Sequence, residues 1–193
     1  NDFFFFFGNS LIAIQVMNEL EKTTGKRLPL SSLFEYPTIE TFSRLLNEDI
    51  KIDQWSALVP IKPQGTKPPV YIVHGAGMEV LIFKQLADNL NIDQPVFGLQ
   101  AKELFNSDGE FDTIEKIATH YVNTIIKNNP NGPYSLAGYS FGGIIAYEMS
   151  RVLLALGKKV TMVGLFDTVV EPTFHYSSSF GKKLALMCYE NKR

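Results

Sequence analysis

Hydrophobic residues after position 56 follow two alternating spacings, and these predict the architecture of most of the chain. Short apolar runs with the length of buried strands lie at 69–73, 95–99, 134–139 and 160–166. Apolar residues recur every three or four positions, as in amphipathic helices, over 80–90, 113–128 and 143–156. This strand–helix order predicts an α/β fold with a mostly parallel sheet and right-handed crossovers. The run 56–61 is predicted as an edge strand that begins this domain.

The first fifty residues have a purely helical pattern. Apolar residues recur at about four-residue spacing from Leu11 to Leu20, with Ser10 at the N-cap position and Gly25 after the last turn. Thr38 is the expected cap of a second helix, whose apolar face comprises Ile39, Phe42, Leu45 and Leu46. Residues 47–69 mix charges and prolines without periodicity, which is typical of a linker. We therefore predict a small helical domain at 1–48, a linker at 49–57 and an α/β domain at 58–193.

The pentapeptide Gly138-Tyr139-Ser140-Phe141-Gly142 lies between a predicted strand and a predicted helix. A Gly-x-Ser-x-Gly sequence in that context is typical of the nucleophile elbow of α/β-hydrolases. The tight turn strains the serine backbone, and the two glycines leave room where neighbouring chains pass. Ser140 is therefore the candidate nucleophile, and the N–H of Phe141 is a candidate oxyanion donor at the helix start. The alternative is an ordinary glycine-rich turn.

A second loop, His74-Gly75-Ala76-Gly77, follows the first parallel strand. A loop at this place supplies the other oxyanion donor in α/β-hydrolases, and here we expect it to be the N–H of Ala76. A dinucleotide-binding loop is not expected, because the third glycine position is Val80. His74 precedes the elbow, so we expect it to orient this loop rather than to act as the base.

Asp167 directly follows the 160–166 strand, 27 residues after Ser140 (167 − 140). A carboxylate at the carboxyl end of that strand can reach the end of the sheet where Ser140 is expected. Asp167 is therefore the candidate triad acid, which would hold a histidine in the required tautomer. The alternative is a polar residue that ends a strand.

Charge and cysteine content narrow the class of protein. The net charge of −2 favours neither nucleic acid nor an anionic membrane as a partner. Cys188 is the only cysteine, which excludes an intrachain disulfide and favours a cytoplasmic protein. The apolar run Phe3–Phe7 is too short for a signal peptide or a membrane span. The three histidines are scattered, and no metal-ligand cluster is visible, so no metal is expected.

Three segments of the N-terminal region carry a family resemblance: Asp2-Phe3-Phe4, Gly8-Asn9-Ser10-Leu11 and Leu33-Phe34-Glu35-Tyr36-Pro37-Thr38-Ile39. Together they resemble the peptidyl carrier domain of a nonribosomal peptide synthetase. The resemblance implies a covalent 4′-phosphopantetheine arm on Ser10, and a phosphodiester at a helix N-terminus meets free N–H groups. The family's first glycine is Phe7 here. The alternative is that Ser10 is only a helix cap.

From His74 to Asp167 the chain resembles the thioesterase domain that ends such assembly lines. The features are Gly-Tyr-Ser-Phe-Gly-Gly at 138–143 and the aspartate directly after the next strand. The resemblance implies an α/β-hydrolase fold preceded by a partial carrier domain, with both domains incomplete. The resemblance also implies that the catalytic histidine lies well beyond Asp167, and we expect it beyond residue 193. The alternative base is His175, the only histidine after Asp167. We expect thioesterase activity to be impaired in this chain alone.

Both resemblances together imply release of a carrier-bound acyl or peptidyl thioester. The acyl group would move to Ser140 and leave by hydrolysis or macrocyclisation. The implied partners are upstream synthetase domains, a phosphopantetheinyl transferase and the thioester substrate. Two alternatives remain open: a hydrolase scaffold that docks a carrier without catalysis, and a stand-alone esterase with an unrelated helical appendage.

Overall fold

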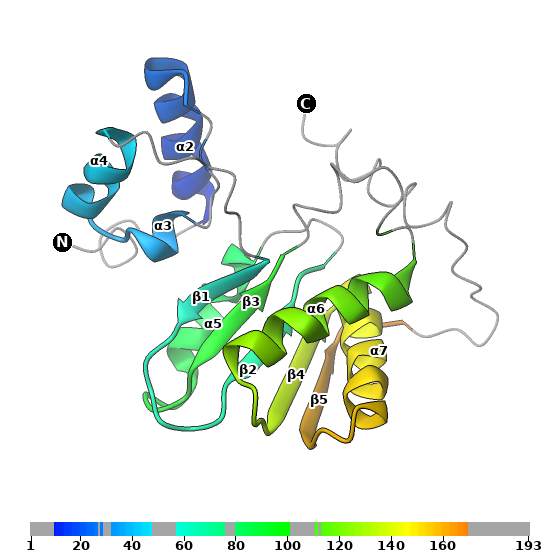
Figure 1. The fold of residues 1–193 in the computed structure, drawn as a ribbon. Coiled ribbons are helices and arrows are strands. Elements are labelled where there is room, and N and C mark those ends of the chain that lie inside the picture. The colour runs from blue at the N-terminus through cyan, green and yellow to red at the C-terminus, as the bar shows by residue number, and fades with distance from the viewer. Residues whose placement is uncertain are drawn as a thin grey trace.

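A computed structural model of the 193-residue chain describes residues 10–26, 28, 32–47, 57–75, 80–100, 111 and 113–169. The N-terminal helices are α2 (Ser10–Thr24), α3 (Ser32–Glu35) and α4 (Ile39–Asn47). The strands are β1 (Leu58–Lys62), β2 (Val70–Val73), β3 (Val96–Leu99), β4 (Tyr134–Tyr139) and β5 (Val160–Phe166). The helices between the strands are η1 (Leu81–Phe83), α5 (Lys84–Asn89), α6 (Ile114–Asn128) and α7 (Phe141–Ala155). Each predicted strand and helix is therefore present, with its bounds shifted by a few residues (Figure 1).

The described strands form one sheet in the order β1-β3-β2-β4-β5. Strand β1 pairs antiparallel with β3, and the other pairs are parallel. The predicted edge position of β1 is confirmed, and an edge accommodates Pro60, which has no N–H to donate. Val73 lies level with Leu99 on one side and Gly138 on the other, so the parallel strands end together. The loops that follow β2, β3, β4 and β5 therefore lie at the same end of the sheet.

Successive side chains of β2 pack into hydrophobic clusters on opposite faces of the sheet. Tyr71 and Val73 join a cluster with residues of α6 and α7, whereas Ile72 joins a cluster with residues of α5. A strand places successive side chains on opposite faces, so all three of these neighbours can be buried. Figure 1 shows α6 and α7 on the near face of the sheet, with α5 on the far face. Helices thus cover both faces, as a mostly parallel sheet requires.

The N-terminal helices have a small core of their own. It consists of Ala13, Met17, Leu33, Phe42 and Leu45, and Leu81 of η1 packs into it. Because Leu81 belongs to the α/β region, this core also joins the two regions of the chain. Ile39 is 79% exposed, so its predicted place on the apolar face of α4 is wrong: as the first residue of that helix, it does not reach the core that Phe42 and Leu45 enter.

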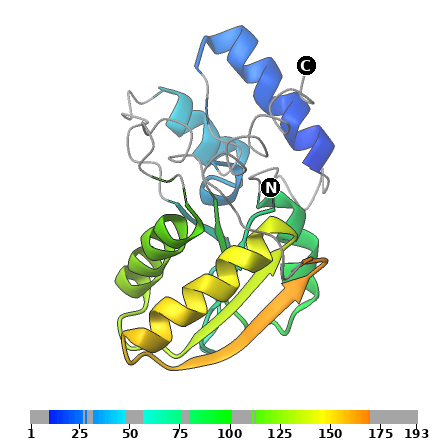
Figure 2. The ribbon, with the colours of Figure 1, turned by 90° about the vertical axis from the view of Figure 1, so that its right-hand side faces the viewer.

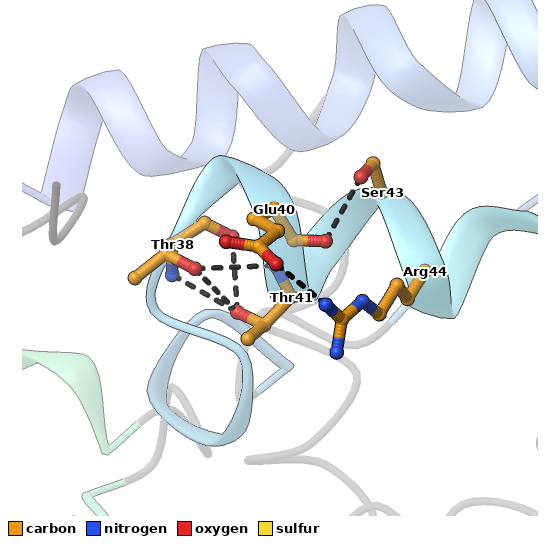
Figure 3. Close-up of polar contacts among 5 residues, drawn as sticks. All are labelled: Thr38, Glu40, Thr41, Ser43 and Arg44. Carbon is orange, nitrogen blue, oxygen red and sulfur yellow. Dashed lines mark hydrogen bonds and ion pairs between the residues drawn. The ribbon is translucent and has the colours of Figure 1, made fainter.

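Two threonines fix the start of α4 (Figure 3). The N–H of Thr41 donates to Thr38 Oγ1 at 3.1 Å, and the N–H of Thr38 donates to Thr41 Oγ1 at 3.2 Å. This reciprocal pair satisfies two backbone donors that a helix start leaves free, and it confirms Thr38 as the cap. One turn on, Arg44 pairs with Glu40 on the exposed face, an interaction worth only about 0.3–0.5 kcal/mol.

The sequence pattern predicts Asp112 as the cap of the helix at 113–128, and this prediction is wrong. Thr113 is the N-cap, and its side chain accepts a hydrogen bond from the N–H of Lys116. Threonine and aspartate are both good caps, so residue preference alone does not choose between neighbours. At the C-terminal end of α7, Gly157 has φ +69°, the left-handed conformation in which a glycine commonly ends a helix.

Helices α2, α3 and α4 lie beyond the carboxyl ends of the parallel strands in two perpendicular views (Figures 1 and 2). Strand β5 and the start of α7 reach the same side of the molecule. The predicted linker 49–57 lies outside the described residues except for Ala57, and the predicted domain boundaries stay a prediction.

Candidate active site

The turn between β4 and α7 consists of a single residue, Ser140. Strand β4 ends at Tyr139 and α7 begins at Phe141. Ser140 has φ 53° and ψ −119°, a conformation that costs a non-glycine residue roughly 1–3 kcal/mol. Hydrogen bonds on both sides hold it there: its N–H donates to Phe166 O at 2.8 Å, and its carbonyl accepts from the N–H of Gly143 at 3.0 Å. This strained strand-to-helix geometry is that of a nucleophile elbow.

Close backbone contacts explain the two glycines of the pentapeptide. A Cβ at position 138 would lie 2.1 Å from the carbonyl oxygen of Gly142. A Cβ at position 142 would lie 2.2 Å from the carbonyl oxygen of His74. Both obstacles are backbone atoms, which cannot turn aside as a flexible side chain can. The glycines therefore let α7 start directly against the ends of β4 and β2.

The turn that carries Asp167 lies against the turn that carries Ser140. Asp167 also has a positive φ, 47°. The next residue, Thr168, has its hydroxyl oxygen 3.2 Å from the carbonyl oxygens of both Ser140 and Phe166. A Cβ on Gly143 would lie 1.9 Å from that hydroxyl, so this glycine makes room for the Thr168 side chain. The structure thus brings the backbones of the candidate nucleophile and the candidate acid together.

His74 lies at the end of β2 and is completely buried. Its N–H donates to the carbonyl oxygen of Leu99 at 3.1 Å. In the ring, Nδ1 lies 2.6 Å from the carbonyl oxygen of Gly75, and Nε2 lies 2.8 Å from the hydroxyl of Tyr121. Burial lowers the pKa of His74 from 6.5 to about 4, and the hydrogen bond to Gly75 opposes this only in part. The ring is therefore neutral at physiological pH.

The backbone after His74 continues toward the elbow. A Cβ added to Gly75 would lie 3.0 Å from Cδ1 and 3.4 Å from the carbonyl oxygen of Tyr139. Gly75 therefore packs against the residue that precedes Ser140. Residue Ala76, the other candidate oxyanion donor, lies outside the described residues, as do His175 and Cys188.

Ser10 is the first residue of α2, in agreement with its predicted place at a helix start. Phe141 is likewise the first residue of α7, as its predicted role requires. Neither position by itself tests the assigned role, so both roles stay predictions. Two features were not expected from the sequence: Thr168 as a link between the two turns, and Tyr121 as a partner of His74. Thr168 adjoins Asp167, whereas Tyr121 gave no signal beyond its place on an apolar stripe.

The apolar periodicity of the helix at 113–128 leaves His120 off the buried stripe and predicts a solvated surface residue, and this prediction is wrong. His120 is half-buried, and its ring lies edge-on to that of Phe111, with 4.8 Å between the ring centroids. Phe111 precedes α6, and the apolar periodicity of the helix itself did not include it. Among the described residues, no group of three histidine, cysteine or carboxylate side chains is placed to hold a metal ion.

Two regions of the chain match the models of known protein families. Residues 68–186 match the model of the thioesterase domain, and residues 1–46 match the model of the phosphopantetheine attachment site. The chain belongs to the thioesterase-domain family. This thioesterase domain follows a carrier region that bears a phosphopantetheine attachment site, as the sequence resemblance predicted. The predicted α/β-hydrolase class, a mostly parallel sheet with flanking helices, is confirmed.

Individual relatives of this chain are much longer proteins. Malpinin synthetase of Mortierella alpina is 39% identical over 171 residues, which are 87% of this chain and 2% of that protein. The chain spans between 2% and 18% of the first curated relatives that it matches. A crystal structure of a four-domain nonribosomal peptide synthetase bound to AMP and glycine matches 88% of this chain and 13% of its own, with 32% identity and a TM-score of 0.61.

A solved thioesterase domain matches a smaller share of the chain. It is the NocB domain of the nocardicin cluster, which aligns over 69% of this chain and 66% of its own, with 26% identity and a TM-score of 0.56. The same domain has been solved in covalent complex with a fluorophosphonate nocardicin G analogue. None of the described helices combines the length and the apolar character needed to cross a bilayer.

Proposed function

We propose that this chain is the carrier and product-releasing region of a nonribosomal peptide synthetase. The carrier would present an acyl or peptidyl thioester, and Ser140 would accept the acyl group. The observation that carries the proposal is the strained Ser140 turn, on a chain that also bears a phosphopantetheine attachment site. Strain of this kind persists only where surrounding contacts maintain it, and it is common at active sites.

The proposed reaction has two transfers. The Ser140 oxygen forms a bond to the thioester carbonyl carbon, and the carbon–sulfur bond breaks, so the arm leaves as its thiol with the serine proton. Water, or a nucleophile within the acyl chain, then breaks the serine ester and restores the serine hydroxyl. The N–H groups of Phe141 and Ala76 hold the oxyanion in both steps. Asp167 orients the histidine that moves the protons.

We further propose that Ser10 bears the arm. Helix α2 begins at Ser10, and a helix start offers free N–H groups and the positive end of its dipole to a phosphodiester. The 4′-phosphopantetheine group supplies the flexible thiol that carries the acyl chain. Helices α2–α4 lie on the side of the sheet where the parallel strands end, which is the side that Ser140 occupies (Figures 1 and 2). This arrangement supports delivery from Ser10 to Ser140.

The proposed role requires particular partners. Upstream synthetase domains would supply the acyl chain, and a phosphopantetheinyl transferase would add the arm to Ser10. A cytoplasmic location follows from this role, because coenzyme A, the donor of the arm, is an intracellular metabolite. We also propose that this chain alone turns over slowly. His175 is the only histidine after Asp167. The family resemblance implies that the base is a different histidine, so His175→Ala should leave the residual single-turnover rate unchanged.

Covalent labelling tests the nucleophile. A fluorophosphonate probe reacts quickly only with an activated serine, so the parent protein for this test is the intact synthetase, which should become labelled at Ser140, whereas its Ser140→Ala variant should not. Ser135→Ala is the matched control, because Ser135 lies on β4, the strand that leads into Ser140, and its hydroxyl bonds only to Thr161 Oγ1 among the described contacts. Labelling of Ser140→Ala at the parent rate would refute the role of Ser140. No labelling of the parent would instead favour a carrier-docking scaffold without catalysis.

A second experiment distinguishes a synthetase region from a stand-alone esterase. Ser140→Ala should abolish product release from an intact synthetase while leaving the loading of the carrier unaffected. A parent chain that labels at Ser140 but never accepts an arm would favour a stand-alone esterase with a helical appendage. Intact-protein mass spectrometry reports both modifications in a single measurement.

A further inference from the structure

The short helical turn η1 packs in two directions. Val80, which precedes it, and Phe83, its last residue, belong to the hydrophobic cluster on the α5 face of the sheet. The N–H of Phe83 donates to the carbonyl oxygen of Val80 at 3.1 Å, and residues three apart in such a tight turn lie on the same side. Leu81 lies between them in the chain and joins the core of the N-terminal helices instead. The turn therefore belongs to two hydrophobic cores at once.

The sheet fixes the place of this turn. A Cβ added to Gly98 of β3 would lie 2.7 Å from the Cβ of Val80 and 3.0 Å from the Cδ1 of Ile61, so the glycine makes room for the valine. Val80 and Phe83 are both buried. The α/β region thus sets the position of Leu81, without help from the N-terminal helices.

Leu81 is the point at which the α/β region enters the carrier core. Every other described member of that cluster lies between Ala13 and Leu46, within the region that matches the phosphopantetheine attachment site. Leu81 is only 5% exposed, so the cluster covers its side chain. Cα atoms of α3 also come within 8 Å of Cα atoms of β1, which places a carrier helix beside the edge strand.

This contact is small for a permanent association. Of the described α/β residues, Leu81 alone enters the cluster, and burial of one leucine side chain changes an equilibrium constant by about 10–100-fold. Ten residues join α4 to β1 (58 − 47 − 1). A short covalent connection gives a local concentration on the order of millimolar, so a weak contact is enough to hold the carrier and still release it.

We propose that Leu81 is a reversible docking anchor for the carrier during product release. The proposal rests on the proposed function, since it assumes transfer from Ser10 to Ser140. Helices α2–α4 lie beyond the carboxyl ends of the parallel strands, on the side of Ser140 (Figures 1 and 2). Docking on Leu81 keeps the arm on that side, and the carrier reaches the upstream domains once Leu81 leaves its core. Loss of the anchor should therefore slow delivery by the arm and leave the reactivity of Ser140 unchanged.

An arm that carries a reactive group measures delivery directly. A coenzyme A analogue with a fluorophosphonate at its thiol end lets a phosphopantetheinyl transferase place this probe on Ser10 of the intact synthetase. The Ser140 oxygen then bonds to phosphorus, and fluoride leaves with the serine proton, so that the arm joins the two serines. Mass spectrometry of the joined peptides gives the rate of delivery. A free fluorophosphonate, added to a separate sample, reports the reactivity of Ser140 alone.

Leu81→Asp places a charge in the carrier core and should slow the arm-borne reaction about 10–100-fold. The free probe should react at the parent rate, because Val80 and Phe83 keep η1 on the sheet, and Ser10 should be loaded normally. Leu81→Met keeps an apolar side chain of similar volume and should deliver nearly as fast as the parent. Ile82→Asp is the matched control: this neighbouring side chain is 52% exposed, so a charge there should change neither rate.

Equal arm-borne rates in Leu81→Asp and the parent would overturn the proposal. So would a parent whose Ser140 reacts with the free probe but never with the arm-borne one. An equal slowing of both probes in Leu81→Asp would also overturn it, because the substitution would then act on the α/β region itself.

Ser140→Ala separates this proposal from the proposed function. If that variant reacts with either probe as fast as the parent, the assigned nucleophile is wrong. If it reacts with neither, and Leu81→Asp delivers at the parent rate, only the anchor is wrong.

Discussion

The main-chain N–H of Ser140 donates a 2.8 Å hydrogen bond to the carbonyl oxygen of Phe166, the residue before Asp167. The candidate nucleophile is thus attached to the strand that carries the candidate acid. Thr168 adds a second connection, because its hydroxyl lies 3.2 Å from the Ser140 carbonyl oxygen. The geometry between the two turns therefore depends on hydrogen bonds that substitution can remove one at a time.

Thr168→Val should slow the labelling of Ser140 several-fold, because valine keeps the shape of threonine but cannot donate to the Ser140 carbonyl. The free energy of unfolding should fall by about 1 kcal/mol, the usual value of one such hydrogen bond. Thr168→Ser retains the hydroxyl and should label nearly as fast as the parent. Labelling stopped at a series of times measures the rate, and urea unfolding measures the stability. A valine variant that labels as fast as the serine variant would contradict a role for the hydrogen bond between Thr168 and Ser140.

Gly138→Ala should destabilise the fold by several kcal/mol, because its Cβ would lie 2.1 Å from a backbone oxygen. Gly157→Ala is the matched substitution. That glycine has φ +69° but nothing within 4 Å of the added Cβ, so only the backbone strain of about 1 kcal/mol should remain. Urea unfolding of both variants measures the difference, and similar losses would mean that the elbow relaxes to admit a methyl group.

The fold was more predictable from the sequence than the site. The spacing of apolar residues located all the parallel strands of the described part of the chain. Burial on both faces explains the continuous apolar runs of β2, β3 and β4, whereas β5 is equally apolar although Met162, Leu165 and Phe166 are partly exposed. The elbow motif located the strained residue, since a tight strand-to-helix turn requires glycine at fixed positions. The partnership of His74 with Tyr121 was not predictable, because it joins residues far apart in the chain through packing alone. Ile39 shows the opposite error: an apolar residue at a helix start satisfied the periodicity and still remained exposed.

Lowering the pH should reduce the free energy of unfolding, because His74 is buried as a neutral ring. Folding lowers the pKa of this ring from 6.5 to about 4, so between these pH values only the unfolded chain binds the proton. The free energy of unfolding should therefore fall as the pH drops from about 7 to 4, by an amount on the order of 3 kcal/mol from this group. Above pH 7 the ring is neutral in both states and contributes no slope.

His74→Asn isolates that contribution. Carboxylates also titrate in this range, but they do so in the parent and in the variant alike. The difference between the two stability curves, measured by urea unfolding at each pH, should shrink or reverse toward pH 4. Parallel curves would mean that the folded parent takes up the proton as readily as the unfolded chain does.

Ser10→Ala should prevent attachment of the pantetheine arm, because the arm is joined through the serine hydroxyl. Incubation with coenzyme A and a phosphopantetheinyl transferase should add one arm to the parent chain, visible as a single mass increment. Ser43→Ala is a suitable control, since Ser43 lies exposed on α4 and donates only to Glu40 O among the described contacts. An arm that still attaches to Ser10→Ala would place the modification elsewhere.

The contacts around Gly138 and Gly142 also determine how the releasing region could be re-engineered. Backbone atoms close on both glycines exclude every other side chain, whatever acyl chain is to be accepted. The two remaining variable positions differ: Tyr139 is 39% exposed, whereas Phe141 packs against the main core cluster. A mutant library aimed at new substrates should therefore keep both glycines fixed and randomise position 139 widely. Position 141 should be limited to large apolar residues, so that fewer members of the library are lost to misfolding.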